Sequence, residues 1–197
     1  MEPLEVLQLI VSRLEKLSVP YMVGGSFASS LHGFARTTQD VDLIVELRAN
    51  QVEGFTRLFA GEFYVDRVSI EQALERATSF NIIHFESSFK VGFFILRNRN
   101  FDLQGFSRRL LRQVDPDSKV ETYVQTPEDT LLSKLERYRM GGEVSEQQWG
   151  DVRGVLKAQA GRLDLTCLSH WAAELGVTDL LERARQEAGT TSTTAGG

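Results

Sequence analysis

Apolar residues near the N-terminus recur at the spacings of one face of an α-helix. They are Leu4, Leu7, Ile10, Val11, Leu14 and Leu17, which lie three, four or seven positions apart. Pro20 is expected to end this helix, because proline cannot continue the helical hydrogen bonding. The apolar run 21–23 then predicts a short strand.

The next strand is predicted over 41–46, where the side chains are expected to alternate between the two faces of a sheet. Val41, Leu43 and Val45 are expected on one face, and Asp40, Asp42 and Ile44 on the other. Two β-rich runs, 80–85 and 89–96, predict a hairpin around Glu86, Ser87 and Ser88. A last short strand is predicted over 120–125.

Helical patterns fill the remaining segments. A helix after Gly24-Gly25 is expected to end near Gly33, a second covers 50–60, and a third covers 70–77 with Ser69 as its N-cap. From Thr126 the pattern becomes wholly helical, with helices predicted near 127–140, 145–159, 164–175 and 178–188. Thr126 and Ser145 are the expected N-caps of the first two.

This element order predicts an α/β (α+β) fold, with a small mixed β-sheet flanked by helices and followed by a helical C-terminal subdomain. We expect an α/β domain over 1–125, the helical subdomain over 126–188 and a disordered tail over 189–197. The tail is small and polar, so it offers little apolar surface to bury.

Composition restricts the functional classes. The formal net charge of −5 argues against a strongly basic nucleic-acid surface. A local cluster of arginines, formed by Arg97, Arg99, Arg108, Arg109 and Arg112, leaves two interpretations open: a patch for RNA or a solvated surface. The single cysteine excludes an intramolecular disulfide, no apolar run has the length of a membrane span, and the N-terminus is acidic where a signal peptide is basic. We therefore expect a cytoplasmic protein that does not bind membranes.

The segment 21–46 carries the candidate chemistry. Gly24, Gly25 and Ser26 form a turn between a strand and a helix, where backbone N–H groups can bind phosphate. Asp40 and Asp42 lie two apart on a strand, so both carboxylates leave the same face. A phosphate site beside paired carboxylates is the combination that nucleotidyl transfer requires.

At these residues the sequence resembles the nucleotidyltransferase superfamily of the DNA polymerase β type. The likeness is greatest to minimal bacterial nucleotidyltransferases and to the toxins of abortive-infection, type IV toxin–antitoxin systems. It includes Arg36-Thr37-Thr38-Gln39-Asp40 before the acidic strand, Phe89-Lys90-Val91 at the start of a third strand, and Pro127-Glu128-Asp129, Lys134, Gly141-Gly142, Ser145, Gln148-Trp149 and Asp151 in the helical half.

The resemblance implies an Mg²⁺-dependent transfer of a nucleotide from an NTP, such as ATP or GTP, to a hydroxyl on RNA (for example tRNA) or protein. Gly25 and Ser26 would contact the triphosphate, and Asp40 and Asp42 would hold Mg²⁺. Lys134 resembles a lysine that neutralises nucleotide phosphate, and Asp151 an acidic residue of the toxins' last motif. It also implies a toxin-like role with a cognate antitoxin.

Arg36 has two interpretations that the sequence leaves open. It would contact the nucleotide, or it would form a buried ion pair with Asp40 or Asp42.

The sequence departs from the family pattern at position 92. The family has an aspartate there, but this chain has Gly92, which supplies neither a metal ligand nor a base. A two-residue turn at Ser87-Ser88 would pair Gly92 with Ile83, and Lys90 would share the face of Gly92 and reach phosphate. Three hypotheses follow. The protein is a transferase with an incomplete acidic triad, or a catalytically impaired protein of the same fold that binds nucleotide or acts as a regulatory module. The third is a plain interaction scaffold, in which Asp40 and Asp42 are merely solvated.

Overall fold

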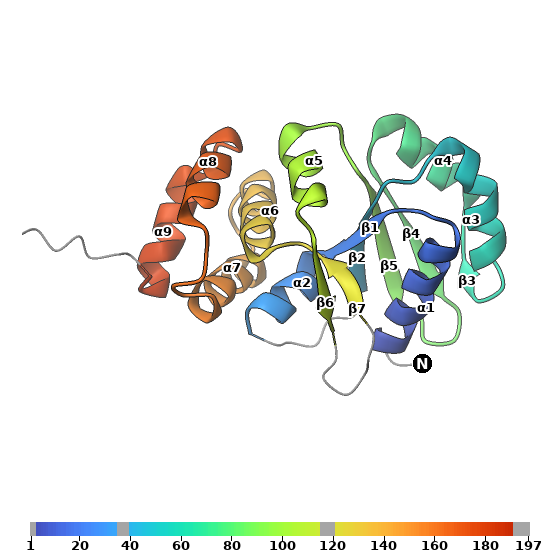
Figure 1. The fold of residues 1–197 in the computed structure, drawn as a ribbon, viewed down its shortest axis with the longest axis horizontal. Coiled ribbons are helices and arrows are strands. Elements are labelled where there is room, and N and C mark those ends of the chain that lie inside the picture. The colour runs from blue at the N-terminus through green and yellow to red at the C-terminus, as the bar shows by residue number, and fades with distance from the viewer. Residues whose placement is uncertain (1–2, 35–39, 115–120, 191–197) are drawn as a thin grey trace, which may run out of the picture. The chain divides into compact units, whose positions relative to one another are not determined.

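The structure is a computed structural model, and the fold is described for residues 3–34, 40–114 and 121–190 (Figure 1). Its helices are α1 (Pro3–Lys16), α2 (Gly25–His32), α3 (Val52–Phe59), α4 (Arg67–Arg76), α5 (Asn100–Ser107), α6 (Pro127–Met140), α7 (Glu146–Ala158), α8 (Leu165–Glu174) and α9 (Thr178–Ala188). Its strands are β1 (Tyr21–Gly24), β2 (Asp40–Val45), β3 (Phe63–Tyr64), β4 (Ser79–His84), β5 (Lys90–Ile95), β6 (Leu110–Gln113) and β7 (Glu121–Val124). The predicted α/β class is confirmed. Among the described helices, none has the length and apolar character needed to cross a membrane.

The chain forms two compact units. Of the described residues, the first contains 3–27, 40–114 and 121–125, and the second contains 28–34 and 126–190. The division falls within α2, whose first residues group with the sheet and whose remainder groups with the C-terminal helices.

The described strands of the first unit form one mixed sheet in the order β3-β4-β5-β2-β1-β7-β6. Strand β2 is central: it pairs antiparallel with β1 and parallel with β5. The hairpin of β4 and β5 extends one side of the sheet, and the antiparallel pair β6 and β7 extends the other. Figure 1 shows α3 and α4 beside β3 and β4.

One face of this sheet is the apolar core of the first unit. Along β2 the residues alternate between half-buried and buried, so Val41, Leu43 and Val45 are buried while Asp40 and Asp42 lie on the other face, as predicted. On the core face an aromatic cluster joins α3 to the strands. Phe55 packs edge-on against Phe80 and Phe93, with ring centroids 5.6 and 5.3 Å apart.

Strand β1 includes another core side chain, Tyr21, which is 3% exposed. Its hydroxyl donates to Glu15 Oε1 at 3.3 Å, and Thr122 Oγ1 donates to it at 3.5 Å. Burial is the main cause that raises the Tyr21 pKa from its ordinary value of 10.0 to about 12.

The predicted start of one helix in the first unit was wrong. The helix predicted over 70–77 begins at Arg67, and its N-cap is Asp66 rather than Ser69, because the Asp66 carboxylate accepts hydrogen bonds from the backbone N–H groups of Val68 and Ser69. Further along the chain, Asp102 lies in the first turn of α5, where it forms an ion pair with Arg99 at 2.7 Å.

The predicted hairpin exists, but its register is shifted by two residues. The backbone N–H of His84 donates to Phe89 O, so the connection is the four-residue loop 85–88 rather than a two-residue turn. Gly92 therefore pairs with Asn81, and Ile83 pairs with Lys90. The shift is even, so each residue keeps its predicted face while its cross-strand neighbour changes.

The second unit packs four helices with the end of α2. The helices predicted after Thr126 are confirmed as α6 to α9, with Thr126 and Ser145 as N-caps. Trp149 of α7 is buried, lies 5.0 Å from Tyr138 of α6 between ring centroids, and donates to Glu187 of α9 at 2.7 Å. Trp149 therefore links three helices of this unit.

The raised pKa of Tyr21 predicts a loss of stability at high pH. The Tyr21 hydroxyl ionises near pH 10 in the unfolded chain but only near pH 12 in the folded protein. The free energy of unfolding therefore falls as the pH rises between these values. Compared with Tyr21→Phe, we expect wild type to lose about 1.4 kcal/mol more per pH unit in denaturant titrations. Tyr64→Phe, at a 56% exposed position, should keep the wild-type slope. Equal slopes for wild type and Tyr21→Phe would contradict the prediction.

Candidate functional site

The turn between β1 and α2 begins the candidate site. Strand β1 ends at Gly24, and α2 starts at the next residue, Gly25, whose φ of +61° is a conformation that favours glycine. Ser26 follows in the first turn of the same helix. The two half-buried residues Gly25 and Ser26 thus lie at a helix start suited to a phosphate group.

Asp42 lies against this turn. It pairs with Gly24 across the antiparallel β1–β2 ladder. A Cβ added to Gly25 would lie 2.9 Å from both Cβ and Cγ of Asp42 and would overlap its Oδ2 atom. The Asp42 side chain therefore occupies space that exists only because Gly25 has no side chain.

Gly92 borders the other side of the same carboxylate. Asp42 pairs with Gly92 in the parallel β2–β5 ladder, which is where the resemblance leads us to expect a third acid. A Cβ at residue 92 would lie 2.7 Å from Asp42 Oδ1. Asp42 thus lies between two glycines: Gly25 at the start of α2 and Gly92 on β5.

Asp40 and Lys90 form the next pair on this face. Asp40 is half-buried at the start of β2, and its register partner on β5 is the exposed Lys90. Since Lys90, Gly92 and Asp40 share a face, a cation lies next to the two carboxylates. Its charge is available to an anionic ligand bound on this face.

The donor set suits a hard metal ion only in part. Carboxylate oxygens are preferred ligands of Mg²⁺, and Asp40 and Asp42 supply them. Among residues 3–34, 40–114 and 121–190, no group of three or more His, Cys, Asp or Glu side chains is arranged to hold a metal. Ligands beyond the two aspartates must therefore come from other oxygens, including those of a bound nucleotide or water.

Sequence reasoning missed two polar residues beside the glycines. Asn81 of β4 pairs with Gly92, and its Oδ1 lies 3.5 Å from the Cβ position of that glycine. Gln125, which follows β7, has its Oε1 2.8 Å from the Cβ position of Gly24. The alternation of polar and apolar residues along 79–82 indicates that Asn81 lies on the polar face of its strand. The predicted two-residue turn, however, made Ile83 the cross-strand partner of Gly92 in place of Asn81.

Lys134 and Asp151 meet in the second unit. Lys134 Nζ of α6 donates to Asp151 Oδ2 of α7 at 2.8 Å, and each side chain is 9% exposed. Ser29 Oγ, from the part of α2 in this unit, donates to the same oxygen at 3.4 Å. This is a buried, hydrogen-bonded ion pair. Removing either side chain is expected to destabilise the protein, because the charge of the other would remain buried without a partner. The last predicted site residue, Arg36, lies outside the described residues.

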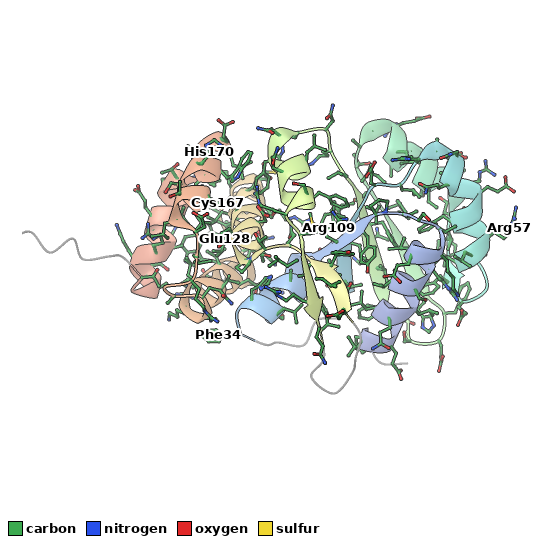
Figure 2. All side chains as sticks on the ribbon, viewed as in Figure 1. Phe34, Arg57, Arg109, Glu128, Cys167 and His170 are labelled. Atoms are coloured by element: carbon green, nitrogen blue, oxygen red, sulfur yellow. The ribbon has the colours of Figure 1, made fainter. Side chains whose placement is uncertain are left out.

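A cavity of about 450 Å³ lies elsewhere in the first unit. Its lining includes Glu46, which follows the end of β2, and Leu96, which follows the end of β5. It also includes Arg109, labelled in Figure 2, whose guanidinium lies 4.5 Å from the ring centroid of Phe106 and 4.7 Å from that of Tyr123. Asp40 and Lys90 begin the same strands, so this cavity lies at the opposite strand ends and is not the candidate site.

No protein-family model matches the sequence, and no curated protein matches it. Solved structures do resemble its fold. An antigenic nucleotidyltransferase-like protein from Paracoccidioides brasiliensis superimposes with a TM-score of 0.54 at 16% identity, covering 92% of this chain and 91% of its own. The antibiotic-resistance factor ANT(2'')-Ia superimposes with a TM-score of 0.57 at 10% identity, covering 93% and 96%. At these identities the likeness establishes the fold alone: the chain has a nucleotidyltransferase-like fold.

Proposed function

We propose that the protein is an Mg²⁺-dependent nucleotidyltransferase that moves an NMP from an NTP to an acceptor hydroxyl. One observation carries the proposal: the register that pairs Asp42 with Gly24 and Gly92 brings a strand carboxylate against the start of α2. A phosphate-binding helix start and a metal-binding carboxylate are then neighbours. The likeness in fold to a nucleotidyltransferase-like protein supports the same assignment.

The proposed phosphate site uses backbone groups of the turn. Gly25 and Ser26 lie at the start of α2, where backbone N–H groups and the helix dipole favour negative charge. Lys90 adds a positive charge on the adjacent sheet face. These groups would hold the β- and γ-phosphates while the α-phosphate faces the carboxylates.

Asp40 and Asp42 are the proposed protein ligands of Mg²⁺. A bound Mg²⁺ supplies charge neutralisation at the phosphates and orients them for displacement. The short Asp42 side chain, confined between Gly25 and Gly92, has little room to reorient, so it presents its oxygens in a fixed direction. Such preorganisation reduces the cost of assembling the reacting groups.

The transfer itself exchanges one oxygen–phosphorus bond for another. The acceptor oxygen bonds to the α-phosphorus, the bond to the leaving pyrophosphate breaks, and the hydroxyl proton passes to solvent water. We propose a hydroxyl on RNA, such as tRNA, or on protein as the acceptor. A toxin-like role with a cognate antitoxin rests on the sequence resemblance, whereas one structural relative is an antibiotic-resistance factor.

A second candidate is a nucleotide-binding or regulatory module without transfer activity. Gly92 favours it, because the position beside Asp42 supplies no third carboxylate. Loss of a general base typically lowers a rate by about 10²–10⁴-fold. Binding of an NTP with Mg²⁺ is common to both candidates, and transfer separates them.

The two carboxylates should control nucleotide binding. We expect an NTP with Mg²⁺ at ~100-fold excess over Kd to raise the Tm by roughly 5–10 °C. Asp40→Asn and Asp42→Asn should lose this rise, because each removes a charged metal ligand. Glu75→Gln, at an exposed position on α4, should retain it. The absence of stabilisation by any NTP in wild type would exclude both candidate functions.

The positive φ of Gly25 should be essential to the turn. Gly25→Ala adds a Cβ at φ +61° against Asp42, at a strain of about 1–2 kcal/mol. We expect a Tm lower by a few degrees and a loss of the nucleotide-dependent rise, both measured by thermal denaturation. Gly61→Ala is the matched control, since no atom lies within 4 Å of its added Cβ. A Gly25→Ala protein that behaves like Gly61→Ala would contradict the proposed phosphate site.

Transfer can be measured directly. Incubation with each α-³²P-labelled NTP, Mg²⁺ and total RNA or protein should label an acceptor, and Asp42→Asn should abolish the labelling. The expected rate is low, because no third acid lies beside Asp42 to take the proton. Nucleotide binding without any labelled acceptor would instead establish the second candidate.

A further inference from the structure

Two oxygens approach the empty side-chain position of Gly92. Asp42 Oδ1 lies 2.7 Å and Asn81 Oδ1 3.5 Å from the point where a Cβ of residue 92 would lie. The Phe94 ring borders the same point, with Cε2 at 3.3 Å. A carboxylate oxygen and an amide oxygen therefore face one small space with an apolar wall.

The strand order explains why the two oxygens converge. Asn81, Gly92 and Asp42 are register partners on three neighbouring strands, β4, β5 and β2. Side chains of register partners leave the same face, and those two strands apart are normally separated by the side chain between them. Gly92 has none, so the space over β5 is open to both outer residues.

We propose that Asn81 is the third protein ligand of the metal, and that Gly92 provides the space in which the ion and the Asn81 side chain meet. The inference rests on the proposed function, since it concerns the metal of that site. Amide oxygens are established ligands of hard cations, and Mg²⁺ binds oxygen at about 2.0–2.1 Å. The ligand expected at position 92 is thus supplied from the adjacent strand.

This substitution changes the charge of the site. An amide is neutral and does not take up a proton at neutral pH, so Asn81 orients a metal ion without serving as a base. Two negative charges in place of three weaken the hold on a free ion. The metal should therefore bind more tightly together with the nucleotide than alone.

Mn²⁺ is a suitable probe, because it takes the same oxygen ligands and its free form is counted by electron paramagnetic resonance. With a non-hydrolysable NTP analogue present, we expect Asn81→Ala to weaken Mn²⁺ binding at least about tenfold, the lower end for loss of a partner around a metal. Asn81→Asp retains an oxygen and should bind at least as tightly as wild type. Ser79→Ala is the matched control, on the same strand and face and paired with Phe94.

Gly92→Ala tests the space itself. Its Cβ would lie 2.7 Å from Asp42 Oδ1 and 3.5 Å from Asn81 Oδ1, so we expect Mn²⁺ affinity to fall although both ligand residues remain. The Tm without metal or nucleotide identifies any general loss of folding. Sub-stoichiometric Mn²⁺ should also broaden the Asn81 side-chain NH₂ signals in a ¹⁵N correlation spectrum, assigned by their absence in Asn81→Ala.

The outcomes separate this inference from the proposed function. If wild type and Ser79→Ala bind Mn²⁺, Asp42→Asn does not, and Asn81→Ala binds like wild type, the Asn81 ligand is excluded while the metal site stands. Asn81 NH₂ signals that keep their intensity at saturating Mn²⁺ would overturn it equally. If wild type binds no Mn²⁺ with or without the analogue, both the site and the ligand assignment fail.

Discussion

The fit of the Asp42 carboxylate between two glycines is the constraint on which the site depends. Gly25 and Gly92 come from different parts of the chain, one at the start of α2 and the other on the strand parallel to β2. A methyl group at either position would enter the space of the Asp42 side chain. Two absent side chains thus allow a strand carboxylate and a helix start to lie in contact, which is the geometry a metal–phosphate complex needs.

The same constraint gives Gly92 a positive role. Because Gly92 stands where the family has an acidic residue, it indicates weakened transfer activity. As an opening between β2 and β4, it admits the Asn81 amide to the space beside Asp42. The two descriptions agree on binding and differ on chemistry: an amide holds a metal ion but takes up no proton. The proposed site is therefore better equipped to bind an NTP with Mg²⁺ than to activate an acceptor hydroxyl.

The helical unit depends on close contacts of its own. A Cβ at Gly33 would lie 2.9 Å from the backbone N of Val155. The backbone just after α2 therefore packs directly against the backbone of α7. Gln159 closes this contact by donating to His32 O at 2.7 Å. The Lys134–Asp151 ion pair lies in the same unit. Because both side chains are buried, packing and mutual charge compensation account for the presence of these two charged residues. A role for Lys134 toward nucleotide remains a proposal based on sequence resemblance.

The sequence by itself determined the local structure of this protein. Periodicity located the long helices and the faces of β2, since these depend on residues near one another in the chain. Gly24-Gly25 and the alternating Asp40 and Asp42 likewise marked the candidate site. Tertiary structure alone decided which residues meet there: the four-residue loop 85–88 shifted the hairpin and brought Asn81, not Ile83, beside Gly92. Pairing across strands depends on loop geometry and on packing between distant segments, which no local pattern records.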